Sequence, residues 1–346
     1  MKDVQEFLTK RFNGRSLRGQ TMMNATGDID TSSLGYQIAI DTLTFIKKQI
    51  TEQKFYEVKL SDYVPIAVGD GAFSQNILTN TTINASADFE EGIVNQASAN
   101  DRLAVADVGI SSKTMAVANW AKAIGYSIFE IEQALQANNW DIIESKHRAR
   151  KRNWDLGIQR MGFLGSKGNN TAFPGLLTSA LVNSDSDTLG SLISDLNYTD
   201  FATFIATVLA AYQLNCAYTA FPTHFIIPQD DYVGLAAPVS AQFPVKSKLE
   251  YLKEAFAAIV PGGVKLLPSA YAIGSSAVGA DVAIGFHRYA MYRYDPESLR
   301  MDIPVDYTVT QPNTLNNFQF QDAAYGQFTG IGVYRALELL YFDLDS

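Results

Sequence analysis

Five cationic side chains lie within seven consecutive residues of this chain, in the stretch ESKHRARKRNWDLGIQ at 144–159. They are Lys146, Arg148, Arg150, Lys151 and Arg152. Ammonium and guanidinium groups at this density can bind phosphates, pair with carboxylates of another protein surface, or form a solvated helix face. The whole chain of 346 residues has a formal net charge of -9. Nucleic-acid affinity depends on neutralising phosphates, so this balance argues against a general nucleic-acid-binding protein.

The arrangement of these charges around a helix helps to choose between the three uses. At about 100° per residue, the five side chains surround most of the helix circumference. A helix that binds DNA usually gathers its charge on one face. A helix that is polar on nearly all sides is typical of an element that bridges several packed bodies. We interpret the run as an intersubunit helix, with a nucleic-acid contact and a solvated helix as the alternatives.

Other residue types that could do chemistry are scattered. The histidines are His147, His224 and His287. None of them has a metal-ligand partner at helical spacing, and the single cysteine, Cys216, excludes an internal disulfide or a multi-cysteine zinc site. Phosphate-binding glycine motifs and a nucleophile elbow are absent from the sequence. The stretch HFIIPQDD could pair His224 with Asp230 or Asp231, but it reads better as a strand, a turn and a helix start. We expect no catalytic set, metal or cofactor.

The first third of the chain has little that could build a core. Residues 3–12 have the spacing of a short amphipathic helix, and residues 54–68 alternate as a strand does. Residues 69–100 are rich in Gly, Ser, Thr and Asn, and residues 102–127 read as a returning strand. Ordering costs about 1–2 kcal/mol per residue. The 69–100 excursion buries too little of itself to offset that cost, so we expect it to rest on another chain.

The rest of the chain predicts a mixture of helices and strands. Ser127 and Glu130 have the spacing of a capping box before a helix at 128–137, and a second helix is expected at 141–161. Residues 195–288 alternate between strands and helices. Thr199 or Asp200 is the expected N-cap of the first helix in this range. The remainder reads as long antiparallel strands. The apolar stretch 201–212 is shorter than the roughly 20 residues that span a bilayer, so no membrane contact is expected.

Five segments in a fixed order resemble a known family. They are WAKAIGYSIFEIEQAL at 120–135, the charged helix at 141–161, FPGLLTS at 173–179, HFIIPQDDYVGLA at 224–236, and MYRYDPESLRMDIPVDY at 291–307. Together they resemble the major capsid proteins of tailed bacteriophages, whose fold is shared with encapsulin shells and the floor domain of herpesvirus capsids. The resemblance extends over roughly residues 30 to 342.

The resemblance implies an α+β fold, the tailed-phage major capsid fold, with five parts. These are an N-terminal arm at 1–53, an extended β-hairpin loop with flanking strands at 54–112, a peripheral domain at 113–194 with its spine helix at 141–161, an axial α/β domain at 195–288, and return strands of the peripheral domain at 289–346.

The implied function is structural. Copies of the chain would assemble into hexamers and pentamers of an icosahedral head shell enclosing double-stranded phage DNA, by exchanging loops and arms. Scaffolding, portal and decoration proteins are further candidate partners, and DNA would be held only loosely and non-specifically. The protein would be synthesised in the host cytoplasm and end in the virion. The basic run would then meet acidic residues of a neighbouring subunit, namely Asp88, Glu90 and Glu91.

Two other classes stay open at this point. The same shell fold could form an encapsulin-like nanocompartment that encloses protein, which nucleic acid copurifying with the particles would argue against. An enzyme of an unidentified class would need a convergent set of acid, base or nucleophile, and the sequence provides no such set.

Overall fold

The computed structural model of the chain describes residues 54–84, 108–137, 142–167, 170–240, 243–274, 284–316 and 318–344. The predictions for the N-terminal arm and its helix at 3–12, and for Asp88, Glu90 and Glu91, lie outside the described residues. Apart from Lys54, the described part belongs to one unit, which comprises Phe55–Ala137 and Asp141–Ser346. In this part, no helix combines the length and the apolar character that crossing a membrane requires.

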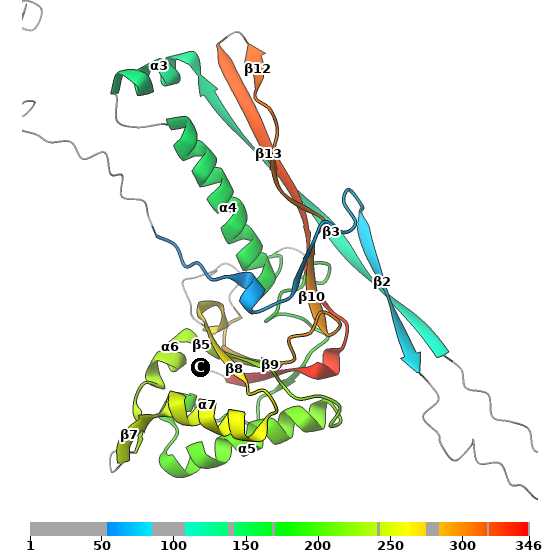
Figure 1. Cartoon of the computed structure of the whole chain (residues 1–346), viewed down its shortest axis with the longest axis vertical. Coiled ribbons are helices and arrows are strands. Elements are labelled where there is room, and N and C mark those ends of the chain that lie inside the picture. Colours follow the sequence, from blue (N-terminus) through cyan, green and yellow to red (C-terminus); the bar gives the residue numbers. More distant parts are fainter. Residues whose placement is uncertain are drawn as a thin grey trace, which may run out of the picture. The chain divides into compact units, whose positions relative to one another are not determined.

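A long antiparallel sheet contains five of the described strands. Its order is β11 (Val305–Val309), β13 (Gln319–Thr329), β3 (Val108–Ser127) and β2 (Asn76–Asn84), with β12 (Asn313–Asn316) pairing β13 at one end (Figure 1). The twenty-residue strand β3 serves two partners in turn. Its first part pairs with β2 and its second part pairs with β13. This confirms the predicted pairing of the excursion with its returning strand, as far as residues 76–84 and 108–116 are concerned.

Helix α4 (Ile142–Leu164) lies along one face of this sheet (Figure 1). Its Trp154 ring lies 5.0 Å from Trp120 of β3 and 6.0 Å from Phe328 of β13, measured between ring centroids. A Cβ atom at Gly326 would stand 2.4 Å from the Trp154 ring. The strand therefore needs a glycine at this position, because the indole ring lies directly on the backbone of β13.

The two predicted helices after β3 are confirmed. In α3 (Ile128–Ala137) the Ser127 Oγ accepts a hydrogen bond from the Glu130 amide at 3.2 Å, and Glu130 Oε2 accepts one from the Ser127 amide at 3.1 Å. This is the predicted capping box. Helix α4 continues three residues beyond the predicted end and is followed by Gly165, whose φ of 71° is the left-handed conformation that glycine tolerates best.

A second sheet forms the core of the remaining elements. Its order is β4 (Asn183–Asp185), β15 (Leu339–Leu344), β9 (His287–Tyr292), β5 (His224–Pro228) and β8 (Lys265–Ser269). Strand β5 is the predicted HFIIP strand, and it runs parallel to β8 and antiparallel to β9. The middle of β5 is fully buried, which explains why it reads as a continuous apolar run.

Three helices pack around this sheet: α5 (Tyr198–Asn215), α6 (Gln229–Gly234) and α7 (Lys248–Ile259). Each was predicted from sequence, but the cap of α5 differs from the prediction. Asn197, not Thr199 or Asp200, is its N-cap, and the Asn197 Oδ1 accepts a hydrogen bond from the Asp200 amide at 3.0 Å. The three candidates are all good capping residues within four positions, so their local sequence could not separate them.

The remaining described elements are short. They are β1 (Ile66–Val68), β10 (Leu299–Ile303) and β14 (Ile331–Val333) in one sheet, β6 (Pro238–Ser240) and β7 (Phe243–Ser247) in another, and the 3₁₀ turns η2 (Leu60–Asp62), η4 (Ile193–Asp195), η5 (Ala270–Ala272) and η7 (Ala336–Glu338).

The predicted strand at 54–68 is wrong except for β1. The chain before β1 passes along α4, where the Val58 amide donates a hydrogen bond to Gln159 Oε1 at 3.0 Å. Leu60, in the η2 turn, is buried in the same core cluster as Trp154. The alternation in this segment therefore comes from contacts of an irregular chain with the core, because α4 supplies the hydrogen-bond partner that a neighbouring strand would otherwise supply.

Candidate functional site

Arg150 is the most buried member of the basic run, with 2% of its surface exposed. Its guanidinium donates to Asp322 Oδ2 at 2.9 Å, to the Asp322 carbonyl at 3.0 Å and to the Tyr307 hydroxyl at 3.0 Å. Burial by itself would lower the pKa of Arg150, but these contacts outweigh it and raise the pKa above its usual value. His147 lies beside the pair, with Nδ1 3.6 Å from Asp322 Oδ2. The cluster fastens α4 to β13 and β11.

Lys146 connects α4 to a different element. Its Nζ donates to Glu130 Oε2 at 3.1 Å and to the Gly125 carbonyl at 2.9 Å. The hydrogen bond from Lys146 lowers the pKa of Glu130, and the bond from the Ser127 amide adds to the effect. One carboxylate therefore caps α3 and anchors α4 at the same time.

Arg152 connects α4 to the segment that precedes the η2 turn. Its guanidinium lies 2.9 Å from Glu57 Oε1 and 4.8 Å from the centre of the Phe55 ring. Arg148 pairs with Glu144 one helical turn away at 2.8 Å, on the exposed surface. Lys151 is exposed as well. Partial burial raises the pKa of the nearby Asp155, and the positive charge of Lys151 offsets only part of that rise.

In the structure this helix joins several parts of its own chain, and its predicted role between subunits stays a prediction. Lys146, Arg150 and Arg152 point to three different elements of their own subunit. For Arg150 the structure corrects the predicted intersubunit contact, because the side chain is enclosed by its own chain. The same contact stays a prediction for Lys146, Arg148, Lys151 and Arg152, and their expected partners in the acidic segment lie outside the described residues.

The catalytic alternative at HFIIPQDD is not supported by the geometry. His224 stacks on Tyr294 with 4.8 Å between ring centroids, and its burial lowers its pKa to about 4. Asp231 is buried and accepts hydrogen bonds from the Ser194 amide at 2.8 Å and the Tyr289 hydroxyl at 2.7 Å. Its neighbour Asp230 pairs with His287 instead. These contacts hold α6 and η4 together, and no acid–base pair with His224 results.

Metal-ligand groups are equally dispersed. Across the described ranges, no three His, Cys, Asp or Glu side chains are arranged to hold a metal ion. Cys216 is buried at the end of α5, with its Sγ 3.3 Å from the Ala220 carbonyl oxygen. It packs as a small apolar side chain.

One face of the β2–β3 ribbon, the face that carries Leu78 and Ile110, is solvent-exposed along its described length, whereas Met115 on the other face is buried. Leu78 is 59% exposed and Ile110 is 74% exposed, although both are large apolar residues. The ribbon is fixed to the rest of the unit near its base, where Lys113 Nζ donates to the Val333 carbonyl and lies 5.8 Å from the centre of the Tyr334 ring. Sequence reasoning missed this clasp, because nothing near Lys113 in sequence points to a partner more than two hundred positions away.

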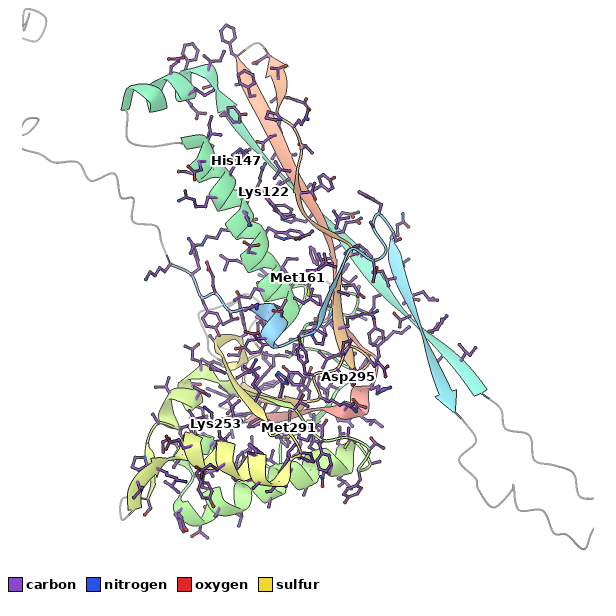
Figure 2. The ribbon with its side chains drawn as sticks, viewed as in Figure 1. Lys122, His147, Met161, Lys253, Met291 and Asp295 are labelled. Carbon is purple, nitrogen blue, oxygen red and sulfur yellow. The ribbon has the colours of Figure 1, made fainter. Side chains whose placement is uncertain are left out.

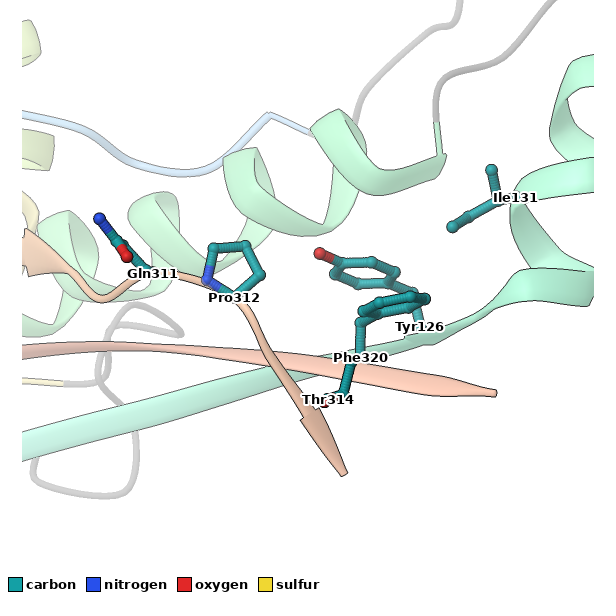
Figure 3. Close-up of a pocket in the computed structure, with 6 residues that line it drawn as sticks. All are labelled: Tyr126, Ile131, Gln311, Pro312, Thr314 and Phe320. Carbon is teal, nitrogen blue, oxygen red and sulfur yellow. The ribbon is translucent and has the colours of Figure 1, made fainter. Parts of the chain in front are cut away.

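Two hollows flank the long sheet. Figure 3 shows the first, a volume of ≈ 490 Å³ beside the end of α3, lined by Tyr126, Ile131, Gln311, Pro312, Thr314 and Phe320. The second has a volume of ≈ 230 Å³ between α4 and the sheet, and its lining comprises Trp120, Asn153, Trp154, Gly157, Ile158, Arg160, Met161 and Phe328. We refer to the second as the tryptophan pocket. Neither hollow was predicted from sequence.

Comparison with protein families gives one match over most of the chain. The family model described as "Major capsid protein" matches residues 92–344. No curated protein sequence matches the chain significantly.

The solved structures with a similar fold include phage capsids. The capsid of Myoviridae phage XM1 has 16% sequence identity and a TM-score of 0.69, and the match covers 88% of this chain and 97% of that one. For Gordonia phage Cozz the identity is 11%, the TM-score 0.56 and the coverage 94% and 98%. For the capsid of cyanophage P-SCSP1u the values are 10%, 0.55, 94% and 97%. At such identities the likeness shows the fold, which is the expected α+β tailed-phage capsid fold.

Proposed function

The chain belongs to the major capsid protein family, and from this premise we propose how its copies contact one another in a phage head shell. As a member of this family it is a structural shell protein and a component of the virion, and the family argues against an enzymatic function. The nanocompartment alternative has weaker support, because the matching family and the structural relatives described above are capsid proteins.

The finer proposal is that each copy lays its β2–β3 ribbon and its N-terminal arm on neighbouring copies. The exposed apolar residues of the ribbon support this proposal. A two-stranded ribbon is at best marginally stable in water, and here Leu78 and Ile110 expose most of their apolar surface. A second protein surface would remove that apolar area from water and cover the outer edge of β2.

Contacts of this kind join one patch of a subunit to a different patch of the next, and such contacts close into rings. We accordingly propose hexamers and pentamers of an icosahedral shell that encloses double-stranded DNA. The division into arm (1–53), loop (54–112), peripheral (113–194 and 289–346) and axial (195–288) parts belongs to this proposal. So do synthesis in the host cytoplasm, scaffolding, portal and decoration proteins as partners, and only loose, non-specific contact with the DNA.

The test is to shorten the ribbon without touching its base. Asn80 and Ser112 are cross-strand partners, so residues 81–111 can be replaced by the two-residue turn Asn-Gly. The contact of Lys113 with Val333 is retained, and no described residue of the core clusters is removed. We expect a folded chain with a melting temperature within about 3 °C of the parent, but no shells by negative-stain electron microscopy. Normal shells from the shortened chain would refute the proposed contact, and an unfolded chain would show that the ribbon serves its own subunit.

A further inference from the structure

The tryptophan pocket lies where α4 crosses the long sheet. Its floor is aromatic and apolar, with Trp120, Trp154 and Phe328 packed edge to face or tilted against one another. Arg160 and Asn153 are the polar side chains of its lining. An apolar hollow with a few polar groups in its lining is the usual form of a site for an aromatic or aliphatic group.

Gly157 provides a second observation at the same place. It lies in the interior of α4, where glycine is less favourable than alanine. A Cβ atom built on it would meet nothing within 4 Å. No contact within the described chain therefore requires a glycine here, unlike at Gly326, where the Trp154 ring does. The space that the missing side chain leaves opens into the pocket.

The edge of β3 beside Trp120 provides a third observation. The pairing of β2 with β3 ends at Asn76 and Ala116, while β13 pairs with Val117 to Ser127 on the other side. Among the described residues, no strand lies beside residues 118–127 on the edge of β3 that faces away from β13. Exposed edges of this length invite an additional strand. Lys122 lies two positions from Trp120 on the same face of β3 and is exposed (Figure 2).

The chain contains one segment whose chemistry complements this site. The sequence DFEEGIV at 88–94 places Phe89 between three carboxylates, Asp88, Glu90 and Glu91. An aromatic ring suits the apolar floor of the pocket, and the carboxylates suit the cations of Lys122 and Arg160.

Chain geometry decides which copy supplies the segment. Phe89 follows Asn84 by five residues, so it lies within about 18 Å of Asn84 even if fully extended. Asn84 pairs with Val108, and Trp120 lies twelve residues further along β3, about 40 Å away. The Phe89 of one chain therefore cannot reach the tryptophan pocket of the same chain.

We propose that Phe89 of a second copy inserts into the tryptophan pocket between Trp120, Trp154 and Phe328, with its flanking carboxylates at Lys122 and Arg160. The segment lies extended along the open edge of β3, and Gly157 is small because the incoming ring occupies the space above it. This inference rests on the proposed exchange of loops between copies and names the residues on both sides of one such contact.

The experiment joins two chains that each carry one cysteine. Both chains carry Cys216→Ala, one also carries Phe89→Cys and the other Gly157→Cys, and the two are co-expressed and purified as particles. A short flexible bismaleimide is expected to give an 89–157 heterodimer, which can form only between copies. The matched control replaces Gly157→Cys with Asp155→Cys, which is exposed and lies about 200° around the helix. The 89–157 product is expected to exceed the control product at least about tenfold, because a docked pair has a high effective concentration.

A filled pocket gives an independent readout. The variant Gly157→Leu is expected to leave the unassembled chain at least as stable as the parent, since leucine favours helices, while shells no longer form. Should Gly157→Cys itself prevent assembly, Asn153→Cys in the same lining takes its place.

The outcomes separate the two levels of the argument. Two results would refute the insertion of Phe89 into the tryptophan pocket and leave the proposed function intact. They are particles in which the 89–157 product is no more abundant than the control product, and Gly157→Leu chains that assemble normally. Absence of particles from the unmutated chain under the same conditions overturns both.

Discussion

Replacing Arg150 with methionine is the sharpest test of how the basic helix is held. Methionine keeps most of the buried length of the arginine side chain and removes its charge. The hydrogen bonds to Asp322 and Tyr307 are lost, and the Asp322 carboxylate, whose side chain is only 1% exposed, is left without its guanidinium partner. Breaking a buried pair by removing one partner costs roughly 3–5 kcal/mol. We expect Arg150→Met to lose that much of the free energy of unfolding.

Arg148→Met is the matched control on the same helix. Its side chain is 56% exposed and pairs with a 65% exposed Glu144, so its removal is expected to cost less than about 1 kcal/mol. The double variant Arg150→Met/Asp322→Leu removes both charges of the buried pair. Since well-packed apolar replacements of such a pair are often neutral, we expect it to recover to within about 1 kcal/mol of the parent.

The measurement is urea unfolding of the unassembled chain followed by tryptophan fluorescence, which reports on Trp154 next to the cluster. If the unfolding free energy depends on urea concentration with the same slope in all variants, only their stability has changed. A cost for Arg150→Met no larger than that of Arg148→Met would refute the assignment of Arg150 as a buried anchor. A double variant as unstable as the single one would show that lost packing, rather than a stranded carboxylate, is the cause.

Two further outcomes follow from single residues. The pKa of His224 is lowered to about 4 from an ordinary 6.5, so between these values the unfolded chain binds more protons and stability should fall as the pH is lowered through this window. His224→Phe, which keeps the aromatic stack, should remove that part of the fall in melting temperature between pH 7 and pH 4.5; an identical fall in both chains would contradict it. Gly326→Ala should lower the free energy of unfolding by about 1–3 kcal/mol through its clash with Trp154. Gly125→Ala, whose Cβ would stand 3.8 Å from its nearest neighbour, is the control, and equal losses for the two would argue against the close packing of Trp154.

Local signals in the sequence were enough for the elements whose reasons for forming are local. The capping box of Ser127 and Glu130 and the buried strand HFIIP both depend on residues within a few positions of one another. The family could be identified because these elements follow one another in a characteristic order. The strand expected at 54–68 failed because its alternation reflects contacts with α4, which follows about a hundred positions later.

The sequence by itself determined that a charged helix follows a capped one, that the excursion after residue 69 lacks a core of its own, and that the parts come in the order of a capsid protein. Only the tertiary structure decided which charges of the helix face inward, because the partner of Arg150 is Asp322, 172 residues away. It alone also formed the tryptophan pocket, since periodicity places a side chain on a face of its own element but carries no information about which distant strand will lie against that face.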